Sequence, residues 1–76
     1  MAEVTIEYCV PCGFRERALD LQRAILASLE GELDSAHLVM GDHGVFRVEV
    51  DGDTVYDKDG HDDDVDDVVR RVRDAL

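Results

Sequence analysis

Two cysteines separated by two residues are the side chains of this sequence best suited to covalent chemistry. They form the motif Cys9-Val10-Pro11-Cys12, and the sequence holds no other cysteine. Thiols at this spacing can close a small disulfide ring with little backbone movement, and the thiolate is the nucleophile of thiol–disulfide exchange. We therefore take Cys9 and Cys12 as a candidate redox pair.

The motif lies between a predicted strand and a predicted helix. Val4, Ile6 and Tyr8 alternate with polar residues, which predicts a half-buried strand that ends at the first cysteine. A helix is predicted from near Gly13. Its apolar stripe comprises Phe14, Ala18, Leu21, Ile25, Leu29 and Leu33.

This position favours thiolate chemistry at both cysteines. The N–H groups and partial positive charge of a helix N-terminus stabilise a thiolate, and Pro11 fits the first helical position, where it would stiffen the ring. Cys12 should lie closer to these N–H groups, whereas Cys9 should be more exposed. Either sulfur could therefore attack.

The remaining elements follow from periodicity and turn residues. The helix should end at Gly31 or at Asp34-Ser35. Strands are predicted over 36–40, 45–50 and 54–56, and Asp51-Gly52 forms the turn between the last two. A loop covers 41–44, an acidic loop covers 57–64, and a helix runs from Val65 to the C-terminus.

The element order β-α-β-β-β-α predicts one domain over residues 1–76. The strand–helix–strand unit makes the first two strands parallel, and the hairpin adds two antiparallel strands, in sheet order 2-1-3-4. Thr5, Glu7, Arg47 and Glu49 share a face that looks solvated, so both helices should cover the other face. We expect a thioredoxin-like α/β (α+β) two-layer sandwich with a four-stranded mixed sheet.

Metal binding is the main alternative use of the cysteines. A structural zinc site needs about four ligands, and His37, His43 and His61 are not paired at ligand spacing. The acidic loop, with Asp57, Asp59, Asp62, Asp63 and Asp64, lacks the order of a calcium-binding loop and reads as a solvated loop and helix cap. We expect no metal and no cofactor; two inert buried cysteines are a further alternative.

Some other residues are candidates for supporting roles. His43 would lie near the cysteines if the loop over 41–44 folds over them, and it is a possible proton partner. Phe14, Phe46 and Tyr56 are expected in the core rather than in contact with a cofactor.

Two segments resemble the selenoprotein W-like (Rdx) family. The stretch over 8–14 resembles that family's strand-ending segment around its two redox residues, and the stretch over 44–52 is similar to its Gly-x-Phe hairpin. The resemblance implies a thioredoxin-like fold and a redox role toward low-molecular-weight thiols or protein disulfides. It points to Cys9 and Cys12 as the redox pair. Supporting residues would be Pro11, Gly13, His43, Gly44 and Phe46.

The resemblance also bears on which sulfur attacks. Selenocysteine-bearing members carry selenium at the position of Cys12, whereas in thioredoxins the first cysteine, here Cys9, is the nucleophile. Thioredoxins also place a cis-proline beside the cysteines. This sequence has only Pro11, so Gly44 and Val45 are expected in that place, where the backbone could accept an extended peptide.

The charge excludes several classes of partner. The formal net charge is −11, with 13 Asp and 6 Glu against 7 Arg and a single Lys58, and such a surface repels nucleic acid and anionic membranes. Asp-rich, Lys-poor composition is typical of proteins from salt-loving microbes, so we expect a halophilic archaeal origin. The N-terminal residues lack the basic and apolar regions of a signal peptide, which favours the cytoplasm. We expect a monomer.

These observations favour a thiol–disulfide oxidoreductase. The alternative of another class is a non-enzymatic redox-sensing or partner-binding module. Turnover distinguishes the two hypotheses, because only the oxidoreductase would cycle repeatedly between dithiol and disulfide.

The charge generates a prediction for stability. We expect the melting temperature to keep rising with KCl beyond roughly 0.1–0.2 M, where ordinary screening is mostly complete. The reason is that salt screens the repulsion between the carboxylates and that these dense carboxylates hold hydration. Thermal unfolding followed by circular dichroism over a KCl series measures this. A flat response would argue against adaptation to high salt.

Overall fold

The computed structural model describes residues 2–57 and 64–76 and has the predicted element order. The elements are β1 (Ala2–Cys9), α1 (Arg15–Leu29), the 3-10 turn η1 (Glu30–Glu32), β2 (Leu33–Gly41), β3 (Phe46–Val50), β4 (Asp53–Asp57) and α2 (Val65–Asp74).

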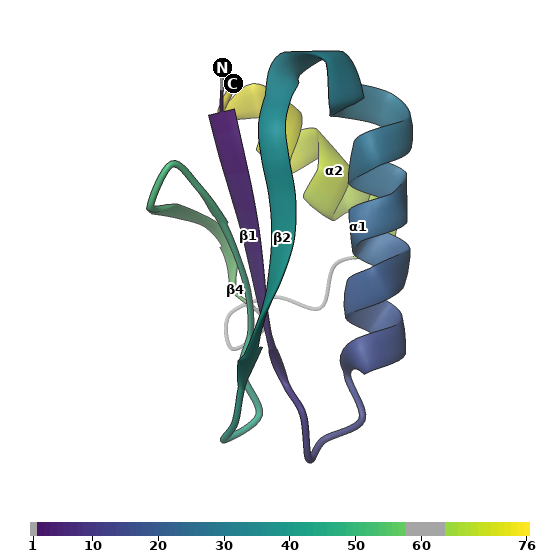
Figure 1. The fold of residues 1–76 in the computed structure, drawn as a ribbon, viewed down its shortest axis with the longest axis vertical. Helices are drawn as coiled ribbons and strands as arrows, with labels where there is room; N and C mark the ends of the chain where they lie inside the picture. Colours follow the sequence, from purple (N-terminus) through teal and green to yellow (C-terminus); the bar gives the residue numbers. More distant parts are fainter. Residues whose placement is uncertain (1, 58–63) are drawn as a thin grey trace.

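The four strands form one mixed sheet in the order β2-β1-β3-β4, as predicted. β1 pairs in parallel with β2 and antiparallel with β3, and β3 pairs antiparallel with β4. Figure 1 shows α1 and α2 on the same side of this sheet. The fold is therefore the expected two-layer α+β sandwich, with β1 in its interior.

The core lies between the sheet and the two helices. Val4 and Ile6 of β1 and Val48 of β3 are fully buried, and they face the helix stripe that contains Leu21 and Ile25. The period of two along the strands and the period of 3.6 along the helix thus place one apolar face against another. Burial of this apolar surface is the main force that holds the two layers together.

The other face of the sheet is half-buried and carries paired polar side chains. Arg47 of β3 forms an ion pair and hydrogen bond with Glu7 of β1, and this hydrogen bond and charge raise the pKa of the guanidinium. The Thr5 Oγ1 and His37 Nε2 atoms are 2.9 Å apart across β1 and β2. The face predicted to be solvated is therefore organised by cross-strand contacts.

The first helix is shorter than predicted at both ends. It begins at Arg15 rather than near Gly13. Gly13 has a φ of 76°, which lies outside the right-handed helical region, so this residue cannot be part of α1. It ends at Leu29, and the tight turn over Glu30–Glu32 redirects the chain. Leu33, predicted in the apolar helix stripe, instead begins β2 opposite Ala2.

The last helix has the predicted cap. The Asp64 carboxylate accepts a hydrogen bond from the backbone N–H of Asp67 at 3.0 Å, and acidic residues occupy the first turn while Arg71 and Arg73 occupy the last. This arrangement complements the helix dipole. Residues 58–63, which include His61 and most of the predicted acidic loop, lie outside the described residues.

The helices of this structure are short. Among residues 2–57 and 64–76, no helix has both the length and the apolar composition needed to cross a membrane.

The core arrangement generates a prediction for stability. Ile6→Ala removes a fully buried side chain from the interior strand and should destabilise the fold by about 2–5 kcal/mol, because a cavity is left behind. Val39→Ala, on edge strand β2 and 39% exposed, is the control and should cost about 1 kcal/mol or less. Urea denaturation measures both, and equal losses would contradict this assignment of the core.

Candidate thiol site

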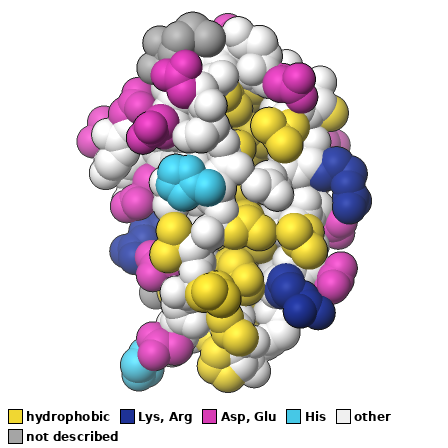
Figure 2. Space-filling model, viewed as in Figure 1, with side chains coloured by type: hydrophobic (Ala, Val, Ile, Leu, Met, Phe, Trp, Pro, Cys, Tyr) yellow, Lys and Arg dark blue, Asp and Glu magenta, His cyan; other side chains and the backbone are white. Residues whose placement is uncertain are grey.

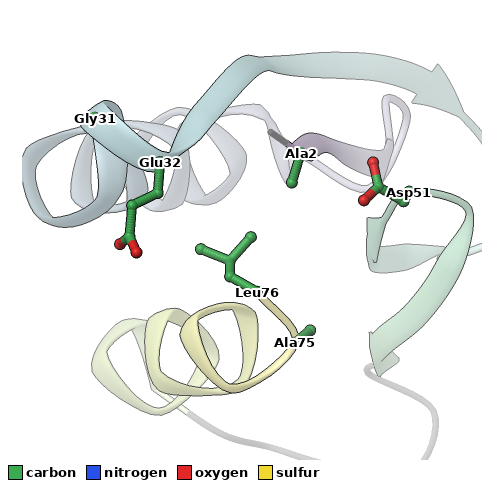
Figure 3. A pocket seen from close by; sticks show the side chains of 6 residues that line it. All are labelled: Ala2, Gly31, Glu32, Asp51, Ala75 and Leu76. Carbon is green, nitrogen blue, oxygen red and sulfur yellow. The ribbon is translucent and has the colours of Figure 1, made fainter.

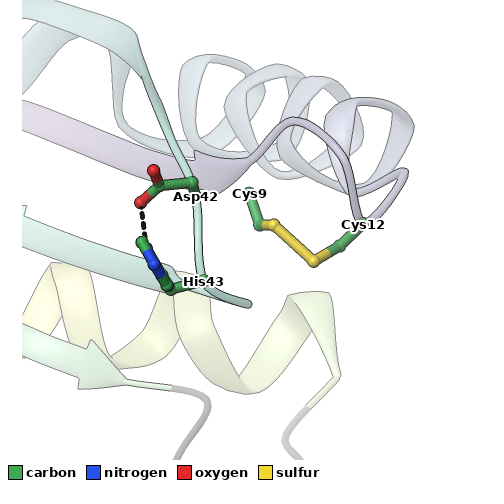
Figure 4. The surroundings of a disulfide bond; sticks show 4 residues. All are labelled: Cys9, Cys12, Asp42 and His43. Atoms are coloured by element: carbon green, nitrogen blue, oxygen red, sulfur yellow. Dashed lines mark hydrogen bonds and ion pairs between the residues drawn. A yellow bond between two sulfur atoms is a disulfide. The ribbon is translucent and has the colours of Figure 1, made fainter.

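Cys9 and Cys12 form a disulfide, with their Cα atoms 5.4 Å apart. Cys9 is the last residue of β1, and Cys12 lies in the turn over 10–13 that leads to α1 (Figure 4). The ring predicted from the spacing is therefore closed, at the end of an interior strand.

The two cysteines differ sharply in exposure. Cys9 has no exposed surface, whereas Cys12 is exposed. The expectation that Cys9 would be the more exposed cysteine is thus wrong. The reason is that Cys9 still belongs to the sheet: it lies beside Gly41 of β2, and its N–H donates to the Val45 carbonyl at 2.8 Å. Only the Cys12 end of the disulfide lies at the surface.

Backbone hydrogen bonds hold the turn that carries Cys12. The Val10 N–H donates to the Gly41 carbonyl at 3.1 Å, the Gly13 N–H to the Val10 carbonyl at 3.2 Å, and the Phe14 N–H to the Cys9 carbonyl at 3.4 Å. Pro11 is exposed within this turn. It therefore stiffens the ring from outside the helix rather than at the predicted first helical position.

Helix α1 begins at Arg15, three residues after Cys12, so the disulfide ring lies outside the helix. The hydrogen bond from the Ala18 N–H to the Phe14 carbonyl, at 3.0 Å, is the first of the i→i−4 type, and Phe14 provides no side-chain cap. The amides of the first turn thus follow Cys12 by three residues or more. The dipole of α1 can favour an anion near this end of the helix, an effect that falls off within about one turn.

The loop between β2 and β3 supplies backbone rather than an acid–base side chain. The His43 imidazole is 89% exposed and its Nδ1 lies 2.5 Å from an Asp42 carboxylate oxygen. Figure 4 shows the ring turned toward Asp42 and away from the disulfide. The structure therefore does not bring the predicted proton partner to the sulfurs. Gly44, with φ of 78°, precedes Val45, whose carbonyl holds Cys9.

Phe46 supports the site from the core, as do its aromatic neighbours. It is 2% exposed and makes edge-to-face contacts with Phe14 and Tyr56, at centroid distances of 6.0 and 6.3 Å. The Arg17 guanidinium lies 5.0 Å from the Phe46 ring centroid. The contact between the Phe46 and Phe14 rings holds Phe14, the residue that joins the cysteine turn to α1.

Gly41 and Glu7 are site neighbours that the sequence analysis did not identify. A Cβ on Gly41 would lie 2.9 Å from Val45 Cγ1 and 3.0 Å from Glu7 Oε2, so no larger residue fits beside Cys9 without movement. The Glu7 carboxylate reaches this position while paired with Arg47. Identifying these two neighbours requires the register of β1 on β2, which a single sequence does not reveal.

The structure also gives two findings on other candidate sites. Within residues 2–57 and 64–76, no three His, Cys, Asp or Glu side chains gather where they could hold a metal ion. A hollow of about 380 Å³ lies at the opposite end of β1 from the disulfide and is lined by Ala2, Gly31, Glu32, Asp51, Ala75 and Leu76 (Figure 3).

Comparison with protein families and curated proteins finds matches over most of the chain. The model of the Rdx family matches residues 3–74. The proteins "Migration and invasion enhancer 1" from Bos taurus and from Mus musculus are each 36% identical over 56 residues, which cover 72% of this chain and 46% of theirs. The chain thus spans about half the length of these relatives.

Two solved structures superpose closely. A crystal structure of a protein from Bordetella parapertussis matches with a TM-score of 0.91 and 31% identity, covering 99% of this chain and 98% of that one. A selenoprotein W-related protein from Vibrio cholerae matches with a TM-score of 0.88 and 24% identity, covering 97% and 95%. The second likeness concerns the fold alone.

The turn geometry predicts that Gly13 is required. Gly13→Ala places a side chain at φ of 76° and should destabilise the oxidised protein by about 1–2 kcal/mol, although the space around it is open. Gly31→Ala is the matched control, since Gly31 also has open space but no positive φ, and it should change stability little. Equal unfolding midpoints for the two variants in urea would contradict the requirement for glycine at 13.

Proposed function

The chain belongs to the Rdx family, and from this membership and its Cys9–Cys12 disulfide we propose a thiol–disulfide oxidoreductase in which Cys12 attacks and Cys9 resolves. The observation that carries the assignment of roles is the difference in exposure: Cys9 is fully buried, and Cys12 is exposed. A disulfide from solution can approach Cys12 directly, whereas it would have to open the sheet end to reach Cys9.

The proposed reaction proceeds in two exchanges. The Cys12 thiolate attacks one sulfur of the substrate disulfide, forms a mixed disulfide, and releases the other substrate sulfur as a thiolate that takes up a proton. The Cys9 thiolate then attacks the Cys12 sulfur, which closes the intramolecular disulfide and releases the second substrate thiol. The substrate gains two electrons, and the protein dithiol loses them.

The site geometry supports the resolving role of Cys9. A hydrogen bond to Val45 at 2.8 Å and the pairing with Gly41 hold Cys9 at the end of β1, and the Cα atoms of the two cysteines are 5.4 Å apart. The second exchange therefore needs little backbone movement. This gives it a high effective concentration relative to an external thiol.

We place this chemistry in the cytoplasm of a cell with high internal salt. A thiol pool there would return the oxidised protein to its dithiol form. The net charge of −11, carried with one lysine among eight basic residues, supports the high-salt setting.

Single-cysteine variants test the assignment of roles. Reduced Cys9→Ser should react with the neutral disulfide 2,2′-dipyridyl disulfide and accumulate a stable mixed disulfide at Cys12, because the resolving thiol is missing. Cys12→Ser should react at least about tenfold more slowly, since its remaining thiol is buried. Absorbance of the released thiopyridone gives the rates, and mass spectrometry gives the adducts.

The wild type is the control for turnover. With excess disulfide and a thiol reductant it should cycle repeatedly and show no lasting adduct. Faster reaction of Cys12→Ser than of Cys9→Ser would reverse the assigned roles. Failure of the wild type to cycle would favour a redox sensor over an enzyme.

A further inference from the structure

The disulfide lies where the two longest charge-free stretches of the sequence meet. In a chain that is 36% charged, residues 8–14 and 35–41 contain no Asp, Glu, Lys or Arg. The sheet register brings them together, because Tyr8 pairs with Met40 and Cys9 with Gly41. The turn extends this contact through the hydrogen bond from Val10 to Gly41. Two uncharged stretches of the chain therefore meet beside Cys12.

Exposed apolar side chains lie along the same part of the chain, with Met40 and Val39 on opposite faces of β2. Val10 is 50% exposed, Val39 is 39% exposed and Met40 is 75% exposed, and Leu76 is the one other large hydrophobic residue that is exposed among the described residues. Figure 2 shows hydrophobic side chains gathered on the lower part of this face, over the end of β2 and the loop after β1. Covering such side chains with a partner is favourable, because it removes apolar surface from water.

Strand β2 also offers a free backbone edge. In the described part of the chain it pairs only with β1, so alternate N–H and C=O groups point outward. Sheet edges are commonly protected by charged residues, proline or bulges. β2 has a register irregularity at its start, but residues 35–41 contain neither proline nor a charged residue. The Gln22 side-chain amide donates to the Ala36 carbonyl at 2.6 Å, so the part of this edge that is open to another strand runs from His37 to Gly41.

We propose that residues 37–41 of β2, together with Val10, bind an extended, uncharged segment of a partner protein and present its cysteine to Cys12. We call this surface the β2 edge site. The inference rests on the proposed function and specifies its substrate as a protein disulfide. A strand added to β2 would lie about 4.8 Å from it and run past Gly41 beside the cysteine turn.

Charge favours such a segment over a small anionic thiol. The Asp42 carboxylate, which directly follows Gly41 and is exposed, disfavours an anionic disulfide at short range, where salt screens charge least. The Arg17 guanidinium lies over the Phe46 ring. A second copy is disfavoured locally, because a symmetric antiparallel pairing of residues 35–41 would bring Asp34 of each copy opposite Asp42 of the other.

The bonds follow from the two exchanges proposed above. The Cys12 sulfur bonds to the sulfur of the docked cysteine, and the other sulfur of the partner's disulfide leaves as a thiolate. The Cys9 sulfur then bonds to Cys12, and the docked cysteine leaves as a thiolate. The partner's disulfide is reduced to two thiols, and the protein dithiol becomes the Cys9–Cys12 disulfide.

Mixed disulfides with one common leaving group isolate recognition from chemistry. Reduced Cys9→Ser protein is reacted with 2-pyridyl mixed disulfides of three thiols: a short peptide of Val, Thr and Ser around one cysteine, the same peptide with Asp in place of Ser, and glutathione. The uncharged peptide should react about tenfold faster than the other two, which corresponds to roughly 1.4 kcal/mol of binding. Equal rates would overturn the edge site but leave the proposed function intact.

Backbone methylation tests strand addition directly. The uncharged peptide is made in two forms, N-methylated at alternate residues in one register or in the other. One register removes N–H groups that would donate to β2 and should slow the reaction about tenfold, to the rate of the Asp-containing peptide, since the hydrogen bonds of strand addition are lost. The other register should react like the unmodified peptide. The same rate for both forms would overturn strand addition.

A matched pair of charge variants locates the surface. In the Cys9→Ser background, Met40→Glu adds a carboxylate to the β2 edge site, whereas Thr54→Glu adds the same charge to β4, the other edge of the sheet. Met40→Glu should lose the preference for the uncharged peptide when each rate is divided by the same variant's rate with dipyridyl disulfide, and Thr54→Glu should keep this ratio unchanged. Equal effects of the two variants would overturn the location.

Sedimentation distinguishes a partner segment from a second copy. The wild type should remain monomeric as its concentration rises. A dimer that Met40→Glu dissociates would overturn the proposal and assign the edge to self-association. Loss of reaction with dipyridyl disulfide in Cys9→Ser itself would instead refute the proposed function.

Discussion

The site depends on the way β1 is held between its two neighbours. β1 pairs in parallel with β2 and antiparallel with β3, and its last residue is Cys9. Hydrogen bonds from Cys9 to Val45 and from Val10 to Gly41 continue the sheet to the point where the turn begins. Because the strand stays in the sheet to its end, Cys9 is buried and Cys12 is left at the surface. The difference in exposure between the two sulfurs thus follows from sheet pairing, and the proposed division of roles rests on it.

The core contacts the cysteine turn at this end of the sheet. Phe46 of β3 is buried and contacts Phe14, the residue that follows the cysteine turn, and the two rings meet edge to face. The turn is therefore anchored on one side by the sheet and on the other by the core. In a chain this small, a core that also fixes the reactive turn gives stability and positioning with the same side chains.

Charge is distributed unevenly over the molecule. Carboxylates give the chain a net charge of −11, yet the stretches that meet at the disulfide carry no charged residue. The proposed β2 edge site is therefore the part of the chain where this contrast in charge is used. Exposure of Met40 beside the turn is consistent with a binding role, because isolated monomers rarely keep apolar side chains together at a surface.

The sequence by itself determined the element order, the sheet order and the two apolar faces, because each depends on local periodicity and on short connections. Val48 and Ile25 were assigned to the core for this reason, and both are buried. Periodicity could not locate the ends of α1. The helix cannot include Gly13 because this residue has a positive φ, which the sequence does not show, and Leu33 fits the apolar stripe of a helix as well as it fits a strand. The Cys9–Cys12 pair was evident from spacing. Only the tertiary structure decided which cysteine is buried, that His43 turns to Asp42, and that Gly41 and Val45 enclose Cys9, because these depend on contacts between distant segments.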